Sequence, residues 1–358
     1  MRIRLTLFFG VFAVMALSNA IVPVLPSFAD SSSLQGAIYA AYFLGAVFST
    51  LPAGILSDRL GRVPLIRLGL VITIISGILL SVVSLPYPVI AIRFIEGIGA
   101  GCFIAAAMSF VNSVPAHEQM SGYFMAMLNA GLVTGLVAAG WLSAYFHLPV
   151  IGVMLFTGCA VIPACAAFFI REAPQLSPAH DTRLLLPLVS GYRWLWYSSV
   201  VMVGITGVVI SLYPEFSGLS SDSAGIWIAL MSVSTIIAVL IASRLSLPPV
   251  PTIRWSAVLM VFGVIIAFYS PSGFIVIGAL AGMVMIAQMA FLASVKAPQG
   301  FAMGLFSTTS YLGMAVLPFL AGLIADSGGF FLAFCAAAFC ALTVALTIGL
   351  CACGKPAS

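Results

Sequence analysis

The chain has 358 residues, of which 63% are hydrophobic and 6% are charged, with 13 Lys or Arg and 9 Asp or Glu side chains. A soluble domain carries about 25% charged residues, so this composition excludes a soluble globule and indicates an integral membrane protein. The basic residues are spread along the chain and form no dense patch, and we therefore expect no nucleic-acid partner.

Stretches without charge follow one another along the chain, each about as long as the ~20 residues that a membrane-crossing helix needs. Two stretches have double length, and turn-forming clusters at 147–149 and 270–273 interrupt them. Backbone groups in lipid must satisfy their own hydrogen bonds, so these runs are helices, and they are too long for barrel strands. We expect twelve spans, at 5–27, 34–56, 64–85, 88–113, 119–145, 149–170, 192–214, 223–243, 253–270, 273–294, 298–324 and 330–353.

Basic residues predict the orientation of the spans. The connections on one side of the predicted membrane, together with the two tails, hold twelve of the 13 basic residues: Arg2, Arg4, Arg59, Arg62, Arg67, Arg171, Arg183, Arg193, Arg244, Arg254, Lys296 and Lys355. The opposite connections contain no Lys or Arg, and their charged residues are Asp30, Glu215, Asp222 and Asp326. Because basic loops remain on the inner side, we expect a multi-pass protein of the cell (plasma) membrane with both termini in the cytoplasm.

The chain shows signs of an internal repeat. Its longest connection on the basic side, about 171–191, separates six spans from six. Three glycines of the fifth span recur 182 residues later in the eleventh: Gly122, Gly131 and Gly140 correspond to Gly304, Gly313 and Gly322. We therefore expect an all-α protein with an N-terminal six-helix bundle at 1–170, a cytoplasmic linker at 171–191 and a C-terminal six-helix bundle at 192–358. Parallel halves built from inverted repeats are typical of transporters, although a duplicated structural protein would show the same spacing.

The connection between the second and third spans holds a distinctive set of residues, namely Gly54, Asp58, Arg59, Gly61 and Arg62. It resembles the cytoplasmic G-x-L-a-D-R-x-G-R loop of the major facilitator superfamily. The resemblance implies the major facilitator fold with two pseudo-symmetric bundles, and a gating role in which Asp58 braces the start of span eleven, where a helix N-terminus favours an anion. Asp58 and Arg62 are four apart and are expected to pair on one helical face. Simple anchoring by positive charge explains the arginines but not the glycines or Asp58.

Span four contains Arg93 and Glu96, followed by Gly97. This segment resembles the family's R-x-x-q-G motif, with Glu96 in place of the usual Gln. Positions i and i+3 of a helix meet on one face, which predicts an ion pair. A charge inside a span costs at least about 2.5–3.5 kcal/mol on insertion scales, so charges kept there tend to be functional. Our hypothesis is that the pair couples proton movement to transport; the alternative is a structural pair that fixes span four to its neighbours.

Span five carries Gly131, Gly135 and Gly140. These positions resemble the family's antiporter pattern g-x-x-x-G-P-x-x-G-G. Leu136 stands where that pattern has Pro, and Ala139 replaces one Gly, so a packing surface of small residues is an equal alternative.

A substrate cavity is expected at the centre of the fold, which spans one, four, seven and ten line in this architecture. The candidate lining residues are Met15, Asn19, Phe103, Thr206, Tyr213, Met285, Gln288 and Tyr311. Such a lining is mostly apolar, and Met and aromatic surfaces suit promiscuous apolar ligands. Ordinary packing is the alternative role for each of these residues.

These features predict a secondary transporter that works by alternating access and exports small amphipathic or apolar compounds in exchange for protons. The expected partners are a small-molecule substrate, protons and the lipid bilayer; we expect a monomer, no cofactor and no metal. The alternative is an uptake symporter or facilitator for a polar solute such as a sugar or organic anion, with Arg93 holding the anion. The sequence contains no HExxH, no GxSxG and no pair of buried acids, so we expect no enzyme.

Overall fold

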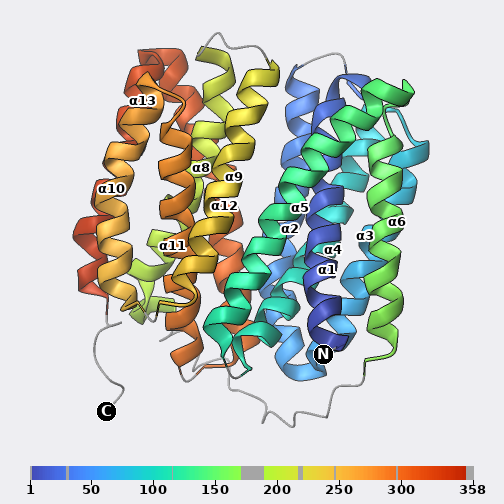
Figure 1. The fold of residues 1–358 in the computed structure, drawn as a ribbon, viewed down its shortest axis with the longest axis horizontal. Helices are drawn as coiled ribbons and strands as arrows, with labels where there is room; N and C mark the ends of the chain where they lie inside the picture. The colour runs from blue at the N-terminus through green and yellow to red at the C-terminus, as the bar shows by residue number, and fades with distance from the viewer. Residues whose placement is uncertain are drawn as a thin grey trace. The chain divides into compact units, whose positions relative to one another are not determined.

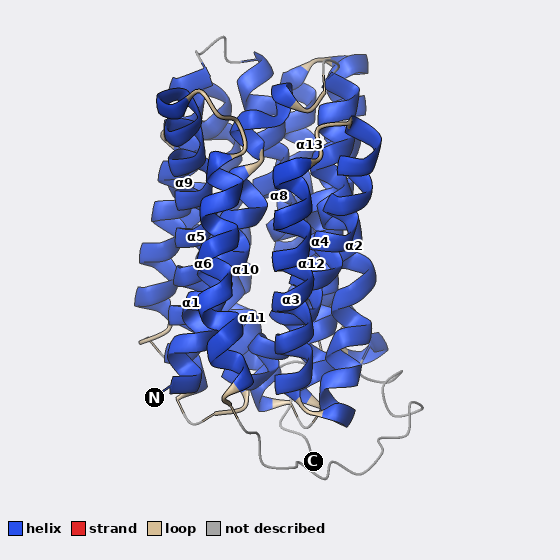
Figure 2. Ribbon diagram, turned by 90° about the vertical axis from the view of Figure 1, so that its right-hand side faces the viewer, coloured by secondary structure: helices blue, strands red, loops and turns tan. Residues whose placement is uncertain are grey.

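The computed structural model describes residues 2–29, 32–114, 116–170, 189–216, 221–245, 247–295 and 297–351. Within these residues it contains twelve α-helices and no strand (Figures 1 and 2). The helices are α1 (Arg2–Ala20), α2 (Ser32–Leu60), α3 (Arg62–Val82), α4 (Pro86–Asn112), α5 (His117–Phe146), α6 (Ile151–Phe168), α8 (Arg193–Phe216), α9 (Ser221–Ala242), α10 (Pro249–Tyr269), α11 (Gly273–Ser294), α12 (Gln299–Gly328) and α13 (Phe330–Thr347). Two short 3-10 helices are η1 (Val22–Ser27) and η3 (Ile348–Leu350).

The predicted all-α membrane architecture is confirmed. Eleven of the described helices are long and apolar enough to cross a membrane, and the apolar part of α9, Ile226–Ala242, is a shorter twelfth. The chain is therefore a multi-pass membrane protein.

The helix boundaries agree with the predicted spans at two turns and differ from them at the first span. The predicted turns are found where Pro and Gly cluster, since α5 ends before His147, which has a φ of 52°, and α11 begins at Gly273. The first predicted span is different, because the α-helix ends at Ala20 and η1 follows. Pro23 and Pro26 cause this change, since proline has no N–H to continue an α-helical ladder.

The chain divides into two compact units. The first consists of the described parts of Met1–Val114, Tyr123–Pro178 and Pro298–Thr308, and the second of those of Pro115–Gly122, Ala179–Ala297 and Thr309–Ser358. Helices α5 and α12 thus each contribute to both units. The proposed domain limits 1–170, 171–191 and 192–358 stay a prediction, and 171–188 lie outside the described residues.

Helix packing repeats between the units. In the first unit α2 packs on α4, α3 packs on α4 and α6, and α1 packs on α6. In the second unit α9 packs on α11, α10 packs on α11 and α13, and α8 packs on α13. Five helices of each half therefore make the same four pairings in the same chain order, which is the packing expected of a duplicated bundle.

The repeated glycines lie at equivalent helix crossings. A Cβ atom on Gly131 would overlap the carbonyl oxygen of Phe12 in α1, and one on Gly313 would overlap that of Val200 in α8. Close backbone approach at small residues is how membrane helices pack. The third pair is different, because a Cβ on Gly322 would meet no atom of the described residues within 4 Å.

Candidate functional site

The connection between α2 and α3 is a sharp turn at Gly61. Its φ of 89° lies in a region that favours glycine, and α3 begins at the next residue, Arg62. Asp58 therefore lies in α2 and Arg62 in α3. The two residues thus do not lie on the face of one helix, because the turn at Gly61 divides it between them, and the pairing of their charges stays a prediction.

The carboxylate of Asp58 binds the first turn of α12. Its Oδ1 accepts a hydrogen bond from the backbone N–H of Gly300, and its Oδ2 accepts one from Phe301, each with an N···O distance of 2.8 Å. All three residues belong to the first unit. The first N–H groups of a helix have no partner inside the helix, and the helix dipole favours an anion there. Hydrogen bonds to an ionised acceptor are also the strong ones.

Glycines bring the backbones of α2 and α12 together beside Asp58. A Cβ on Gly54 would overlap the carbonyl oxygen of Gly300, and a Cβ on Gly300 would overlap that of Gly54. Neither position accepts a side chain without movement of the helices. Further along both helices, the hydroxyls of Thr50 and Thr308 share a hydrogen bond of 2.6 Å. The contact of α12 with α2 therefore extends over several turns.

The two arginines of this loop have different surroundings. Arg62 is buried, its Nε donates a hydrogen bond of 3.1 Å to Oγ of Ser109, and its guanidinium lies 5.9 Å from the centre of the Phe110 ring. Arg59 is exposed in the last turn of α2, where a cation suits the helix C-terminus. Arg62 thus fixes the loop to α4.

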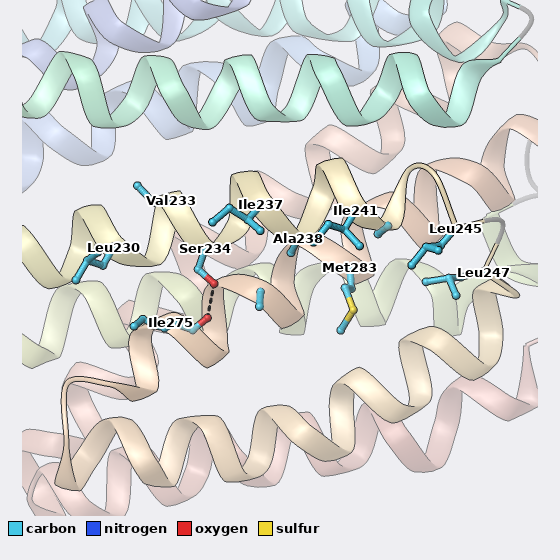
Figure 3. Close-up of a pocket in the computed structure, with 12 residues that line it drawn as sticks. Leu230, Val233, Ser234, Ile237, Ala238, Ile241, Leu245, Leu247, Ile275 and Met283 are labelled. Atoms are coloured by element: carbon cyan, nitrogen blue, oxygen red, sulfur yellow. Dashed lines mark hydrogen bonds between the residues drawn. The ribbon is translucent and has the colours of Figure 1, made fainter.

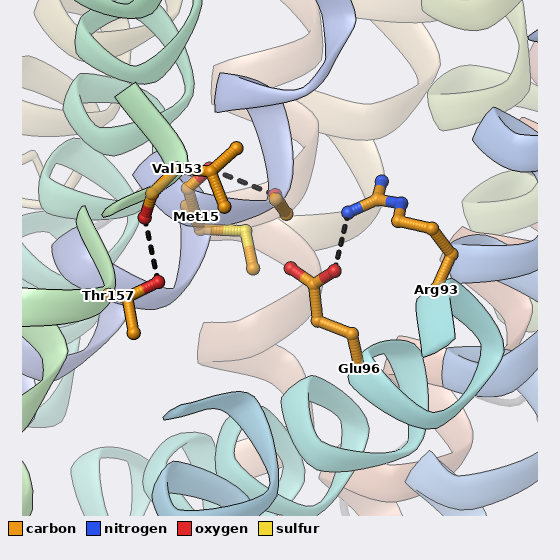
Figure 4. Close-up of polar contacts among 6 residues, drawn as sticks. Met15, Arg93, Glu96, Val153 and Thr157 are labelled. Carbon is orange, nitrogen blue, oxygen red and sulfur yellow. Dashed lines mark hydrogen bonds and ion pairs between the residues drawn. The ribbon is translucent and has the colours of Figure 1, made fainter. Parts of the chain in front are cut away.

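Arg93 and Glu96 form a buried ion pair in α4 (Figure 4). Nη1 of Arg93 lies 2.7 Å from Oε2 of Glu96, and each side chain is 1% exposed. The other carboxylate oxygen, Oε1, is buried and has no hydrogen-bond partner among the described residues, and the same holds for Nε of Arg93. In Figure 4, Glu96 points into the space between Arg93 and Met15. The carboxylate can therefore accept a proton on an oxygen that no other group occupies.

Tyr42 of α2 completes the surroundings of the pair. The guanidinium of Arg93 lies 4.7 Å from the centre of its ring, at cation–π distance. One helical turn along α4 from Arg93, a Cβ on Gly97 would overlap the carbonyl oxygen of Tyr42, so α2 and α4 lie in close contact here. Tyr42 is not predictable from local spacing in the sequence, because the helix crossing brings it to Arg93.

The glycines of the fifth span lie against α1. Gly131 faces the carbonyl of Phe12, and a Cβ on Gly135 would overlap the carbonyl oxygen of Ala16. Gly140 has room, since its Cβ would lie 3.4 Å from Cβ of Pro23. This geometry is that of a close helix crossing, and the antiporter role of these glycines stays a prediction.

Three candidate cavity residues lie in the first unit. Met15 is buried beside Gly131, and Asn19 is half-buried and donates a hydrogen bond of 3.1 Å to the carbonyl of Leu132 in α5. Phe103 is fully buried, and its ring packs so closely on Gly10 that a Cβ there would overlap it. Asn19 and Phe103 therefore contribute to the packing of α1.

The other five candidates lie in the second unit. Gln288 is fully buried, its Nε2 donates a hydrogen bond of 2.8 Å to Oγ of Ser198, and its Oε1 has no partner in the described part of the chain. Tyr213 is buried edge-on against Phe274, with ring centres 4.8 Å apart. The three remaining residues, which are half-buried, are Thr206, Met285 and Tyr311. Membership of a substrate cavity stays a prediction for all eight residues.

An apolar groove of about 510 Å³ lies along α9 and α11 of the second unit (Figure 3). Leu230, Ile237, Ile241 and Met283 are among its lining residues. None of the eight cavity candidates lines this groove. Ile237 and Ile241 are 54% and 55% exposed, so this face of α9 meets lipid in a membrane.

The comparisons with known proteins point to one family. The family model described as Major Facilitator Superfamily matches residues 7–298. Multidrug resistance protein 2 of Bacillus subtilis is 25% identical over an alignment that covers 86% of this chain and 84% of that protein. Quinolone resistance protein NorA of Staphylococcus aureus is 23% identical, with 89% of each chain covered.

Solved structures show the same fold. The human organic anion transporter MFSD10 superposes with a TM-score of 0.81 at 17% identity, covering 97% of this chain and 99% of that one. The Escherichia coli fucose:proton symporter FucP superposes with a TM-score of 0.76 at 18% identity, covering 98% of both chains.

Proposed function

Because the chain belongs to the Major Facilitator Superfamily, we propose that it exports small amphipathic or apolar compounds in exchange for protons, by alternating access. Members of this family are transporters of small molecules and not enzymes. We further propose that the protein acts as a monomer in the plasma membrane, with both termini in the cytoplasm; the basic residues in the connections on that side support this orientation.

The buried pair Arg93–Glu96 is the observation that carries the proton-coupling proposal. As an ion pair it is neutral, and its two charges are 2.7 Å apart. A proton on Glu96 leaves Arg93 as an unpaired cation, which costs several kcal/mol in a dry interior. The protonated state is therefore stabilised when water reaches α4, so binding of a proton and opening of this region to one side of the membrane depend on each other.

Two observations support an amphipathic or apolar substrate. The curated relatives are named for multidrug and quinolone resistance. In addition, amide groups of the proposed lining hydrogen-bond to other helices, as Asn19 does to Leu132 and Gln288 to Ser198. Few polar groups then remain for a sugar, whose hydroxyls each need a partner.

Asp58 and its neighbours supply the proposed gating contact. Helix α12 has its first turns in the first unit and the rest in the second. We propose that alternating access breaks the hydrogen bonds from Gly300 and Phe301 to Asp58, because these bonds hold the start of α12 to α2. We propose that this contact sets how long the cytoplasmic side stays closed.

Transport in liposomes tests the proposal. Purified protein is reconstituted with an imposed pH gradient, and fluxes of a lipophilic cationic dye, a sugar and an organic anion are measured. We expect proton-driven dye movement, and Glu96→Gln should lower it at least about tenfold while dye exchange without a gradient persists, because general acid–base groups act through a transferable proton. Glu118→Gln is the matched control, because it makes the same substitution in the first turn of α5 and leaves the ion pair of α4 intact.

Two outcomes would contradict the proposal. If the sugar or the anion moves and the dye does not, the protein is an uptake carrier for a polar solute. If Glu96→Gln keeps full proton-driven transport, the coupling role of the ion pair is rejected and the pair is structural.

A further inference from the structure

The first turn of α12 contacts α4 as well as Asp58 of α2. Gln299 is the first residue of α12, and its Oε1 accepts a hydrogen bond of 3.0 Å from Nδ2 of Asn112. Asn112 is the last residue of α4 and is 3% exposed. The two residues are 187 positions apart in the chain and belong to the same unit. The start of α12 therefore has α2 on one side and α4 on another.

A second contact extends this attachment along α4. The hydroxyl of Ser307 donates to Sδ of Met108 at 3.4 Å, and both side chains are buried. Met108 lies one turn before Asn112 in α4, and Ser307 lies about two turns after Gln299 in α12. Contacts at two levels fix the rotation of α12 about its own axis, which a single contact does not.

The rotation of the first turn decides whether Asp58 can be reached. The N–H groups of Gly300 and Phe301 directly follow Gln299, and both must face α2 to reach the carboxylate of Asp58. Since Gly300 offers no side chain to direct the turn, a side-chain contact at Gln299 is the nearest means of orienting it.

We propose that Asn112 and Gln299 are positioning residues, whose hydrogen bond holds the first turn of α12 in the orientation that Asp58 requires. Helix α4 then joins the proton site to the gate, because the residues from Glu96 to Asn112 form one continuous stretch of α-helix, about 24 Å long at 1.5 Å per residue. This inference rests on the proposed function for its role in transport, but not for its geometry.

Hydrogen–deuterium exchange of the full-length protein in lipid nanodiscs tests the geometry without any substrate. The amides of residues 300 and 301 are followed in overlapping peptides by mass spectrometry. Asn112→Ala should speed their exchange about 3- to 10-fold, the effect of losing one net hydrogen bond. Asp58→Asn is the positive reference and should speed it at least as much. Asn129→Ala is the matched control, since Asn129 bonds the carbonyl of Met125 in its own helix.

A rescue variant separates positioning from a general loss of stability. The exchanged pair Asn112→Gln with Gln299→Asn keeps one amide donor, one amide acceptor and the summed side-chain length, so it should restore slow exchange at 300 and 301. A thermal melt confirms that each variant is folded. Unchanged exchange in Asn112→Ala, with faster exchange in Asp58→Asn, would overturn the proposal, and so would a failure of the exchanged pair to restore protection.

Transport measurements on the same variants test the proposed export function and not the geometry of the hydrogen bond. Faster exchange at residues 300 and 301 in Asn112→Ala supports the positioning role of the Asn112–Gln299 hydrogen bond, whether or not the dye moves in liposomes. Failure of the wild-type protein to move any dye counts against the proposed export function only.

Discussion

The crossing of α2 with α4 in the first unit and the crossing of α9 with α11 in the second follow one plan but differ in charge. The 182-residue spacing of the repeat carries Arg93 and Glu96 to Ile275 and Gly278. Where the first unit has its ion pair, the second has a hydrogen bond of 2.6 Å from Ser234 to the carbonyl of Ile275 (Figure 3). Thr235 of α9 likewise donates to the carbonyl of Gly278 at 3.0 Å.

This difference shows that the helix crossing itself does not require charge. The second unit forms it with hydroxyl groups that are satisfied by backbone carbonyls. A buried ion pair is weak evidence for stability, because the desolvation of two charges offsets most of their attraction. This comparison supports the proposal that the pair in the first unit serves transport, and the variants below test it against a packing role.

The largest effect should come from removing one charge of the pair. Arg93→Leu leaves Glu96 buried without its partner and should lower the free energy of unfolding by about 3–5 kcal/mol. Adding Glu96→Ala leaves the crossing of α2 with α4 uncharged, like that of α9 with α11, and should restore most of this loss while proton-driven transport stays absent. Denaturant unfolding in detergent micelles measures both variants. A double variant as unstable as the single one would mean that packing needs the pair.

A smaller effect should be equal in the two units. Gly131→Ala and Gly313→Ala each place a methyl group against a backbone carbonyl, of Phe12 and Val200, and should each cost about 1–3 kcal/mol of stability. Thermal unfolding of the two variants checks this equality. A large effect in one unit alone would show that the repeat is one of sequence and not of packing.

Gly322→Ala serves as the control for these crossings. A Cβ there would meet nothing within 4 Å, so stability should stay the same or rise by about 0.5–1 kcal/mol, because Ala favours a helix over Gly.

The smallest effect should come from the neutral counterpart of the ion pair. Ser234→Ala removes the hydrogen bond to Ile275 and should lower stability by about 0.5–1.5 kcal/mol. It should leave the response of transport to a pH gradient unchanged, unlike Glu96→Gln. Dye flux measured over a series of imposed gradients tests this, and an altered response would show that the second unit also takes part in proton coupling.

Several parts of the candidate site were predictable from the sequence. The i, i+3 spacing predicted the contact of Arg93 with Glu96, and the loop resemblance placed Asp58 at the start of α12. Asp58 and Arg62 were expected on the face of one helix, but Gly61, at a φ of 89°, ends the helix between them. Tyr42, Ser109 and the pair Asn112–Gln299 were not found, since nothing in local spacing links residues of different helices.

The sequence by itself determined which segments enter the membrane, because a charge or a proline cluster ends each apolar run and lipid forces the backbone within it to be helical. Only the tertiary structure decided which face of each helix lies inside, as with Gln288 against Ser198 and Phe103 against Gly10. The reason is that lipid and the protein interior are equally apolar, so the two faces of a membrane helix carry similar residues. Backbone approach at glycines and hydrogen bonds between distant helices then select the partners.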